Sequence, residues 1–380
     1  MSEKHEIKMF TPLTVVFIGL FGLGCWAAFY RLTKGLGAAT NLSDRFPWGF
    51  WIGFDVLGGV AMAAGGFLIA GCVYLLHWEK YRPIVRPAIL NAFFGYLLAA
   101  LAIMLDIGVP WRIWHPVVPA MWQIHSVMWI VAIHVVLYTT TLATESSPMI
   151  FEKLNLQSAA KLVKLVMVPV VLFGVLLSTL HQSSLGAVYL ITPAKMSPLW
   201  YNSQLPYLFL ISAIAMGLSM VSFETILSAK AFRHELNMDI LSGLARGCFI
   251  TLSIYLALKV YLLAQGPGLG AAFSGTTEAK MFLLEMTLGV LIPVALLAVR
   301  KVRETTSSIL VVNVMVVVGV LINRMNVGIF GLYRDASAKG GSYFPSTIEI
   351  LLTLGFISFS VLGFKLAAKY LDLFPEEAKA

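Results

Sequence analysis

The chain has 380 residues, of which 59% are hydrophobic and 12% are charged, and its formal net charge is +8. So few charged side chains cannot cover the apolar ones in water, which excludes a soluble globular protein and indicates an integral membrane protein. The basic residues lie mostly in short turns between apolar runs, where they orient a chain in the lipid bilayer, so we expect no nucleic acid as a partner.

Ten apolar runs are long enough to cross about 30 Å of hydrocarbon as helices. They cover residues 12–30, 50–77, 88–108, 124–144, 162–181, 205–228, 247–264, 281–299, 307–324 and 346–366. The first run is too long for a signal-peptide core and lacks a cleavage site behind it, so we expect it to be retained. The sequence predicts an all-α integral membrane protein whose single domain, 1–380, is a bundle of about ten transmembrane helices.

Lys and Arg residues are distributed unevenly between the two ends of the predicted helices. The side that holds both termini carries 17 of them and the opposite side carries 9. This bias predicts both termini in the cytoplasm and a multi-pass protein of the cytoplasmic (inner) membrane. The longer loops, 31–49, 109–123, 182–204 and 325–345, then face outward, and their Gly, Pro, Trp and Tyr content suits partner docking.

Three cysteines, Cys25, Cys72 and Cys248, lie inside apolar runs without the spacing of a metal-binding motif. The chain therefore cannot supply the four thiolates of an iron–sulfur cluster, and we predict no metal site in it. Any metal redox centre is expected in another subunit.

Ionisable residues inside the predicted spans mark candidate functional sites, because a charge in hydrocarbon costs about 2.5 kcal/mol or more. Eight of them are predicted in the outer third of the membrane: Asp55, Asp106, His125, His181, Lys259, Glu285, Arg324 and Glu349. A shared depth is typical of the walls of a polar cavity. The alternative to a cavity is that several of these residues form buried ion pairs, such as Arg324 with Glu285 or Asp55. We assign Arg324 and Glu349 a structural ion-pair role.

Two further ionisable residues, Glu224 and His134, are predicted deeper in the sixth and fourth spans. His134 is followed at helical spacing by Tyr138, Thr141 and Glu145, which predicts a polar stripe on one helix face running toward the cytoplasm. Such a stripe could carry protons. His125 is nine residues from His134, about half a turn out of phase, so the two imidazoles are expected to point to opposite faces.

Short motifs are spread over the whole chain. They are Phe46-Pro47-Trp48-Gly49 with Phe54-Asp55, Val85-Arg86-Pro87-Ala88, His181-Gln182-Ser183-Ser184-Leu185-Gly186, Pro198-Leu199-Trp200, Phe223-Glu224, and Tyr343-Phe344-Pro345 before Glu349. Together they resemble the NrfD/polysulfide-reductase membrane subunit family, and particularly the ten-helix membrane subunit of the hydrogenase-2 type and its relatives in redox complexes of sulfate reducers. The positions that match polar residues of the hydrogenase branch are Asp55, Asp106, His181, Glu224, Glu285 and Glu349.

This resemblance implies a subunit without haem or iron–sulfur cluster that passes electrons between a quinone, expected to be menaquinone, and a ferredoxin-like iron–sulfur subunit on the outer face. Further catalytic or cytochrome subunits, of the hydrogenase, sulfur-metabolism or multihaem type, would complete the complex. The fourth span has Ile130 where the hydrogenase branch has a glutamate. This departure favours a sulfur-metabolism or multihaem complex over a hydrogenase.

We predict that the quinone docks near the outer surface against His125 or His181 and an acid such as Asp106. Its predicted apolar walls are Trp48, Trp111, Trp122 and Tyr207. Because quinone reduction takes up two protons and quinol oxidation releases two, the site needs titratable neighbours. The predicted proton-transfer residues are Glu224, His134, Tyr138, Glu145, Glu285 and Asp55.

Two alternatives remain open at this point. One is a secondary transporter or ion channel, since a polar cluster in the membrane also suits ion coordination. The other is a membrane anchor, with or without a haem b, which needs two imidazoles facing each other from different helices. His125 and His181 are predicted at similar depth, whereas His77 and His134 are predicted at other depths.

Overall fold

The computed structural model describes residues 9–232, 235–266 and 268–374. In this part of the chain, ten helices are long and apolar enough to cross a membrane, which confirms the predicted all-α class and span number. Their segments are α1 (Pro12–Lys34); η1 (Trp51–Gly58), α3 (Gly59–Met62), α4 (Ala64–Ala70) and η2 (Gly71–Leu75); η3 (Glu79–Ile84) and α5 (Val85–Asp106); α6 (Val127–Lys153); α8 (Met167–Val188) and η7 (Tyr189–Ile191); α9 (Leu205–Phe232); α10 (Met238–Gln265); α11 (Thr277–Met286), η9 (Thr287–Leu291) and α12 (Ile292–Ala298); α14 (Thr306–Met325), η10 (Asn326–Phe330) and α15 (Gly331–Ala338); and α16 (Thr347–Tyr370). The shorter helices between them are α2 (Leu36–Ala39), η4 (Pro110–Arg112), η5 (His115–Val117), η6 (Pro119–Met121), α7 (Gln157–Leu165), η8 (Leu269–Phe273) and α13 (Arg300–Arg303).

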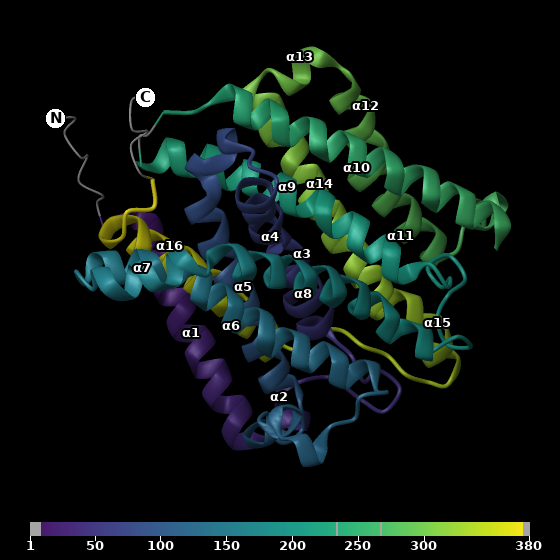
Figure 1. The fold of residues 1–380 in the computed structure, drawn as a ribbon. Coiled ribbons are helices and arrows are strands. Elements are labelled where there is room, and N and C mark those ends of the chain that lie inside the picture. Colours follow the sequence, from purple (N-terminus) through teal and green to yellow (C-terminus); the bar gives the residue numbers. More distant parts are fainter. Residues whose placement is uncertain (1–8, 233–234, 267, 375–380) are drawn as a thin grey trace.

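The bundle has two distinct ends. α1 begins and α16 ends at the same end, where α7 and α13 also lie, and we call this end the terminal side (Figure 1). α2 and α15 lie at the opposite end, which we call the loop side (Figure 1).

The second span is irregular and is the most buried of the ten. It is π-helical at both ends and is interrupted by a turn at Ala63. Its glycines permit close packing: a Cβ added to Gly217 of α9 would lie 2.5 Å from the backbone nitrogen of Gly65. Small residues at such contacts let helix backbones approach closely in a membrane. The carbonyl of Val60 is available to a side chain and accepts from Gln182 Nε2 at 2.9 Å.

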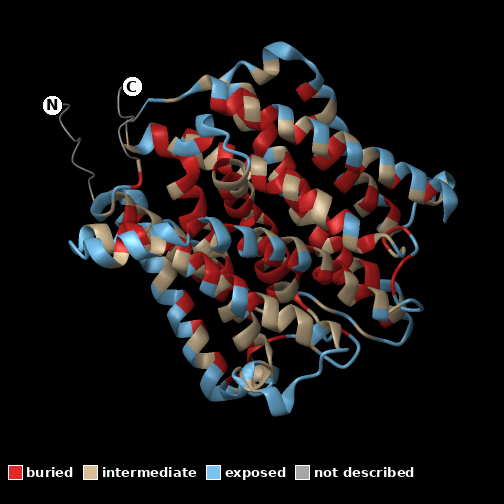
Figure 2. Cartoon of the chain, viewed as in Figure 1, coloured by how far each residue is buried: buried red, intermediate tan, exposed pale blue. Residues whose placement is uncertain are grey.

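The first and last spans, α1 and α16, pair with each other at the edge of the bundle. The closest approach is between Gly24 and Gly355, where a Cβ on Gly24 would lie 2.5 Å from the Gly355 Cα. Much of α1 is exposed (Figure 2). Its exposed apolar side chains include Leu13, Val15 and Phe29, as expected for a lipid-facing helix.

Several helices extend beyond the predicted apolar runs. The run 124–144 corresponds to Val127–Lys153, 247–264 to Met238–Gln265, and 307–324 to Thr306–Ala338. Hydropathy marks only the part of a helix that is rich in apolar residues, whereas the helix itself ends at a cap. The Asn237 side chain, for example, accepts from the backbone nitrogen of Asp239 at 2.9 Å and starts α10 in the polar region.

Candidate functional site

His181 is completely buried in α8. Its ring centroid lies 6.1 Å from that of His134 on α6 and 5.5 Å from that of Tyr96 on α5. Neither nitrogen of His181 has a hydrogen-bond partner among the described residues. Buried polar atoms in native proteins are nearly always hydrogen-bonded, so these nitrogens mark a place where a proton, a water molecule or a ligand can bind.

The structure corrects the predicted depths of the histidines. α6 begins at Val127, later than predicted, so His134 lies seven residues from the loop-side end of α6, just as His181 lies seven residues before Val188 at the end of α8. His134 and His181 are therefore at one level. His125, predicted to share the level of His181, lies in the turn before α6 and is exposed.

A line of buried polar side chains continues from His181 toward the terminal side. The rings of Tyr96 and Tyr138 meet edge to face with centroids 4.4 Å apart, and Ser178 lies beside both hydroxyl groups. Two turns further along α6, Glu145 packs over Gly174, where an added Cβ would lie 2.8 Å from its Oε1. We call His181, His134, Tyr96, Tyr138, Ser178 and Glu145 the buried polar line.

Helical spacing explains why these residues align. His134, Tyr138 and Glu145 lie four and seven residues apart on one face of α6, and Ser178 and His181 lie three residues apart on the facing side of α8. The eleven residues from His134 to Glu145 correspond to roughly 16 Å along the helix axis. Within the described part of the chain, one oxygen of Glu145 and the hydroxyls of Tyr138 and Ser178 lack a hydrogen bond of good geometry.

At the terminal side, the line ends close to a charged surface cluster. Glu145 lies within electrostatic range of Tyr74 in η2, and Tyr74 lies within range of Arg86. Arg86 pairs with Glu152 at 3.1 Å, and Lys164 pairs with the same carboxylate at 2.6 Å. Tyr74 is therefore near both the end of the buried polar line and this surface cluster.

On the loop side, Asp106 forms the end of α5. Arg31, which is 2% exposed near the end of α1, donates to the carbonyls of Leu105 at 2.7 Å and Ile107 at 2.6 Å. The guanidinium thus satisfies free carbonyls at the C-terminal end of α5 and lies within electrostatic range of Asp106. Oδ1 of Asp106 has no hydrogen-bond partner among the described residues.

Glu349 lies in the first turn of α16, within electrostatic range of Asp106. Its carboxylate accepts from the backbone nitrogens of Ser346 at 2.8 Å and Asn41 at 3.2 Å, and from the Tyr343 hydroxyl. Burial and the adjacent Glu349 carboxylate raise the pKa of Tyr343, so its hydroxyl remains protonated and donates to the carboxylate.

Two aromatic side chains lie at the same end of the bundle. Trp48 meets Tyr189 edge to face with ring centroids 5.2 Å apart, and the Tyr189 ring is 1% exposed. The Tyr189 hydroxyl has no hydrogen-bond partner in the described part of the chain and lies within electrostatic range of Asp106. We call Asp106, Arg31, Glu349, Tyr343, Trp48 and Tyr189 the loop-side layer.

The residues predicted to bind the quinone thus fall at different levels. Asp106 is ten residues beyond Tyr96 on α5, roughly 15 Å along the axis, and His181 is at the level of Tyr96. This separation is much longer than the distance between two oxygens on one six-membered ring. Trp122 and Tyr207 are 47% and 59% exposed on the loop-side surface.

Glu285 in α11 is the centre of a separate hydrogen-bonded network. It accepts from the Trp200 indole at 2.8 Å and from the amides of Asn323 at 2.8 Å and Asn326 at 2.7 Å. The Lys259 ammonium lies 3.8 Å from the same carboxylate. With both oxygens occupied, Glu285 is better suited to joining helices than to exchanging protons, which was its predicted role.

Arg324 extends this network on α14. Its guanidinium donates to Asn323 Oδ1 at 2.8 Å, to the Phe209 carbonyl at 3.0 Å and to Ser212 Oγ at 2.9 Å. Arg324 and Glu349 therefore belong to separate networks rather than to the structural pair assigned from the sequence.

The two remaining predicted proton-transfer residues lie elsewhere. Asp55 in η1 accepts from Thr353 Oγ1 at 2.6 Å, and Glu224 in α9 lines a cavity together with Asp55. Neither joins the buried polar line.

Several residues of the buried polar line and of the loop-side layer were not identified from the sequence. Arg31 falls just outside the first apolar run, which ends at residue 30, whereas α1 continues to Lys34. Tyr96 lies within an apolar run and Tyr189 within a predicted loop, and no spacing distinguishes either from its neighbours. For Tyr96 the available signal was a tyrosine in the interior of a predicted span, because a buried hydroxyl needs a partner.

The sequence of the chain is similar to one family of membrane proteins. The family described as "Polysulphide reductase, NrfD" matches residues 38–334. The "Probable Ni/Fe-hydrogenase 2 b-type cytochrome subunit" of Escherichia coli K12 is 30% identical over 98% of this chain and 93% of its own. The "Menaquinone reductase, integral membrane subunit" of Nitratidesulfovibrio vulgaris is 29% identical over 99% and 95%. The "Hdr-like menaquinol oxidoreductase integral membrane subunit" of Archaeoglobus fulgidus is 23% identical over 99% and 96%.

Proposed function

Because the chain belongs to the NrfD family of polysulphide reductase membrane proteins, we propose that it is the quinone-reactive membrane subunit of a respiratory redox complex. The relative named as a menaquinone reductase subunit supports menaquinone as the redox partner. Electrons pass between a quinone in the loop-side layer and the clusters of a ferredoxin-like iron–sulfur subunit. The dispersed positions of Cys25, Cys72 and Cys248 support assigning those clusters to the partner.

The observation that carries this proposal is the buried polar line. Its side chains are incompletely hydrogen-bonded in a bundle that spans a membrane, where unpaired polar groups are costly. A purely structural anchor gains nothing from such an arrangement. A quinone site requires it, because two protons must be exchanged for every two electrons.

In the loop-side layer, the free Oδ1 of Asp106 is the group proposed to exchange a proton with a quinone oxygen. Trp48 and Tyr189 supply aromatic surface for the ring, and Arg31 stabilises negative charge that develops on it. Water is proposed to join this layer to His181, from which the buried polar line leads to the terminal side. With both termini predicted in the cytoplasm, the proposed source of protons for quinone reduction is the cytoplasm.

The loop-side surface is the proposed docking face for the iron–sulfur subunit. Exposed large apolar side chains gather in the loops of this side, including Trp111 at 69%, Phe344 at 75% and Trp122. Aromatic residues are enriched at protein interfaces, which supports this face over the terminal side. Docking here brings clusters close to the loop-side layer.

The proposal is tested by substituting two histidines in the purified complex. His181→Gln removes a titratable group from the buried polar line and is expected to lower quinol-dependent reduction of the partner's clusters at least tenfold, while chemical reduction of those clusters is unchanged. His125→Gln changes an exposed imidazole and is the matched control. A large loss in the His125 variant with normal turnover in the His181 variant would contradict the proposed route.

A haem b is the competing interpretation, since one relative is named a b-type cytochrome subunit. His134 and His181 form the pair of imidazoles that the fold brings together, but Tyr96 packs directly against His181, which favours a site without a porphyrin between the rings. A visible spectrum of the dithionite-reduced protein distinguishes the two. A haem band that is lost in the His181→Gln variant would overturn the haem-free assignment.

A further inference from the structure

A cavity of about 840 Å³ lies between the edge helices and the body of the bundle. α1 and α16 form one wall, and η1, α3, α5 and α9 form the other. The family match, residues 38–334, leaves out both α1 and α16. The cavity is therefore enclosed by two helices that lie outside the matched region.

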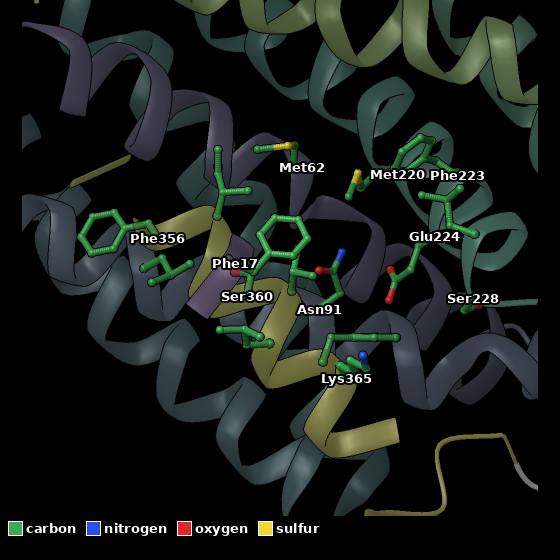
Figure 3. Close-up of a pocket in the computed structure, with 18 of the residues that line it drawn as sticks. Phe17, Met62, Asn91, Met220, Phe223, Glu224, Ser228, Phe356, Ser360 and Lys365 are labelled. Carbon is green, nitrogen blue, oxygen red and sulfur yellow. The ribbon is translucent and has the colours of Figure 1, made fainter. Parts of the chain in front are cut away.

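The lining is mostly apolar and carries a buried carboxyl group near its middle. The two carboxyl oxygens of Glu224 are buried and have no hydrogen bond of good geometry within the described residues. The Asn91 amide on α5 faces this carboxyl across the cavity (Figure 3). Together a carboxyl and a carboxamide offer both donors and acceptors to a ligand.

The polar groups at the two ends of the cavity are already paired. Toward the loop side, Asp55 accepts from Thr353 at 2.6 Å. Toward the terminal side, the Lys365 ammonium donates to Thr14 Oγ1 at 2.6 Å and to the Met9 carbonyl at 3.2 Å. Thr353 and Lys365 are twelve residues apart on α16, so the cavity extends roughly 18 Å along the bundle.

The cavity opens toward the surrounding lipid. Its lining includes four large aliphatic residues that are 40% to 64% exposed: Leu13, Leu227, Ile357 and Val361. An apolar molecule dissolved in the bilayer can therefore reach the interior without crossing a polar surface.

We propose that this cavity binds one prenylated quinone, with the ring oxygens at Asn91 and Glu224 and the isoprenoid chain along the apolar wall. Glu224 lies eight residues before Phe232 at the end of α9, roughly 12 Å inside the bundle. The charged head of a phospholipid does not sit so deep, because a charge at that depth in hydrocarbon is costly. This site goes beyond the proposed function, because it is separate from the loop-side layer.

The test is the amount of quinone that copurifies with the intact complex, measured by solvent extraction and chromatography. Glu224→Leu removes the hydrogen-bonding group, and Ser360→Phe fills the cavity from α16. Each is expected to lower the quinone-to-protein ratio at least twofold. Glu224→Gln keeps a donor and an acceptor and is expected to retain the quinone. Leu366→Phe, on the exposed side of α16, is the matched control.

Equal quinone content in the wild type, Glu224→Leu and Ser360→Phe would overturn the proposal. A loss of phospholipid rather than quinone in these two variants would also overturn it and would assign the cavity to a lipid. Failure of the proposed function has a different signature, since it is measured as quinol turnover. Asp106→Asn is expected to lose turnover while keeping the cavity quinone.

Discussion

The imidazoles of His134 and His181 meet at right angles between α6 and α8, with 6.1 Å between their centroids. Since both rings are at the start of one buried polar line, they are expected to act as a unit. His134→Gln should therefore lower quinol turnover about as much as His181→Gln, at least tenfold, and the double variant should be little worse than either. Steady-state turnover of the three purified complexes measures this. Multiplicative losses would show that the two histidines act independently.

Glu145 is the buried acid of the line, whereas Glu152, two turns further along α6, is paired with Arg86 and Lys164. Glu145→Gln is expected to slow quinol-coupled turnover about tenfold or more because a proton relay loses its titratable group. Glu152→Gln removes only a partly exposed ion pair and is expected to change turnover less than twofold. Turnover in H₂O and D₂O measures the proton step. An equal loss in the two variants would contradict a route through Glu145.

Glu285 has three nitrogen donors and a nearby ammonium, all buried. Glu285→Leu leaves these donors unpaired and is expected to destabilise the bundle by about 3–5 kcal/mol. Glu285→Gln keeps the shape and part of the hydrogen bonding, so we expect a smaller loss. Thermal unfolding in detergent measures both. A leucine variant as stable as the wild type would show that the network does not hold α9, α11 and α14 together.

Gly24 and Gly355 set the distance between α1 and α16. Gly24→Val must push the two helices apart and is expected to cost about 1–3 kcal/mol through overpacking. Gly19→Val, on the same helix with open space around it, is the control and should be nearly neutral. Thermal unfolding of the two variants, with quinone content measured alongside, checks this. Equal midpoints would mean that the helix pair tolerates separation.

Tyr343 links the start of η1 to the start of α16, because its hydroxyl donates to Glu349 and accepts from the Phe50 nitrogen at 2.6 Å. Tyr343→Phe leaves a partly buried carboxylate oxygen and a backbone N–H without this partner, which is expected to cost about 1–3 kcal/mol. The control is Tyr370→Phe, an exposed residue at the other end of α16. If proteolysis and thermal unfolding do not separate the two variants, the link is not stabilising.

The ten spans could be predicted from sequence because a helix in lipid needs a fixed length of apolar residues. The depth of individual side chains along the helices was predicted less well. His134, rather than the predicted His125, lies at the level of His181. The reason is that α6 starts three residues later than its apolar run suggests, so the turn that contains His125 is outside the helix. An error of a few residues at a helix end moves a side chain by several Å, which is enough to separate a residue from its site.

Partners of individual side chains could not be predicted, because they depend on which helices are neighbours. The stripe on α6 was visible as a spacing, but the pairing of that stripe with Ser178 and Gly174 depends on α8. In the same way, Arg324 was expected beside Glu349, whereas the fold gives it Asn323 and the carbonyl of Phe209. A single sequence contains no record of these interhelical contacts.

The contact of Gly24 with Gly355 has a consequence for biogenesis. α1 is made before α16, so at about 5–20 residues per second the ribosome needs roughly 15–60 s to supply the helix that α1 pairs with. During that interval α1 has lipid where α16 will lie, and the space between it and α9 stays accessible from the bilayer. A prenyl chain can settle there before the last span is inserted, so cofactor loading would require no later opening of the mature bundle.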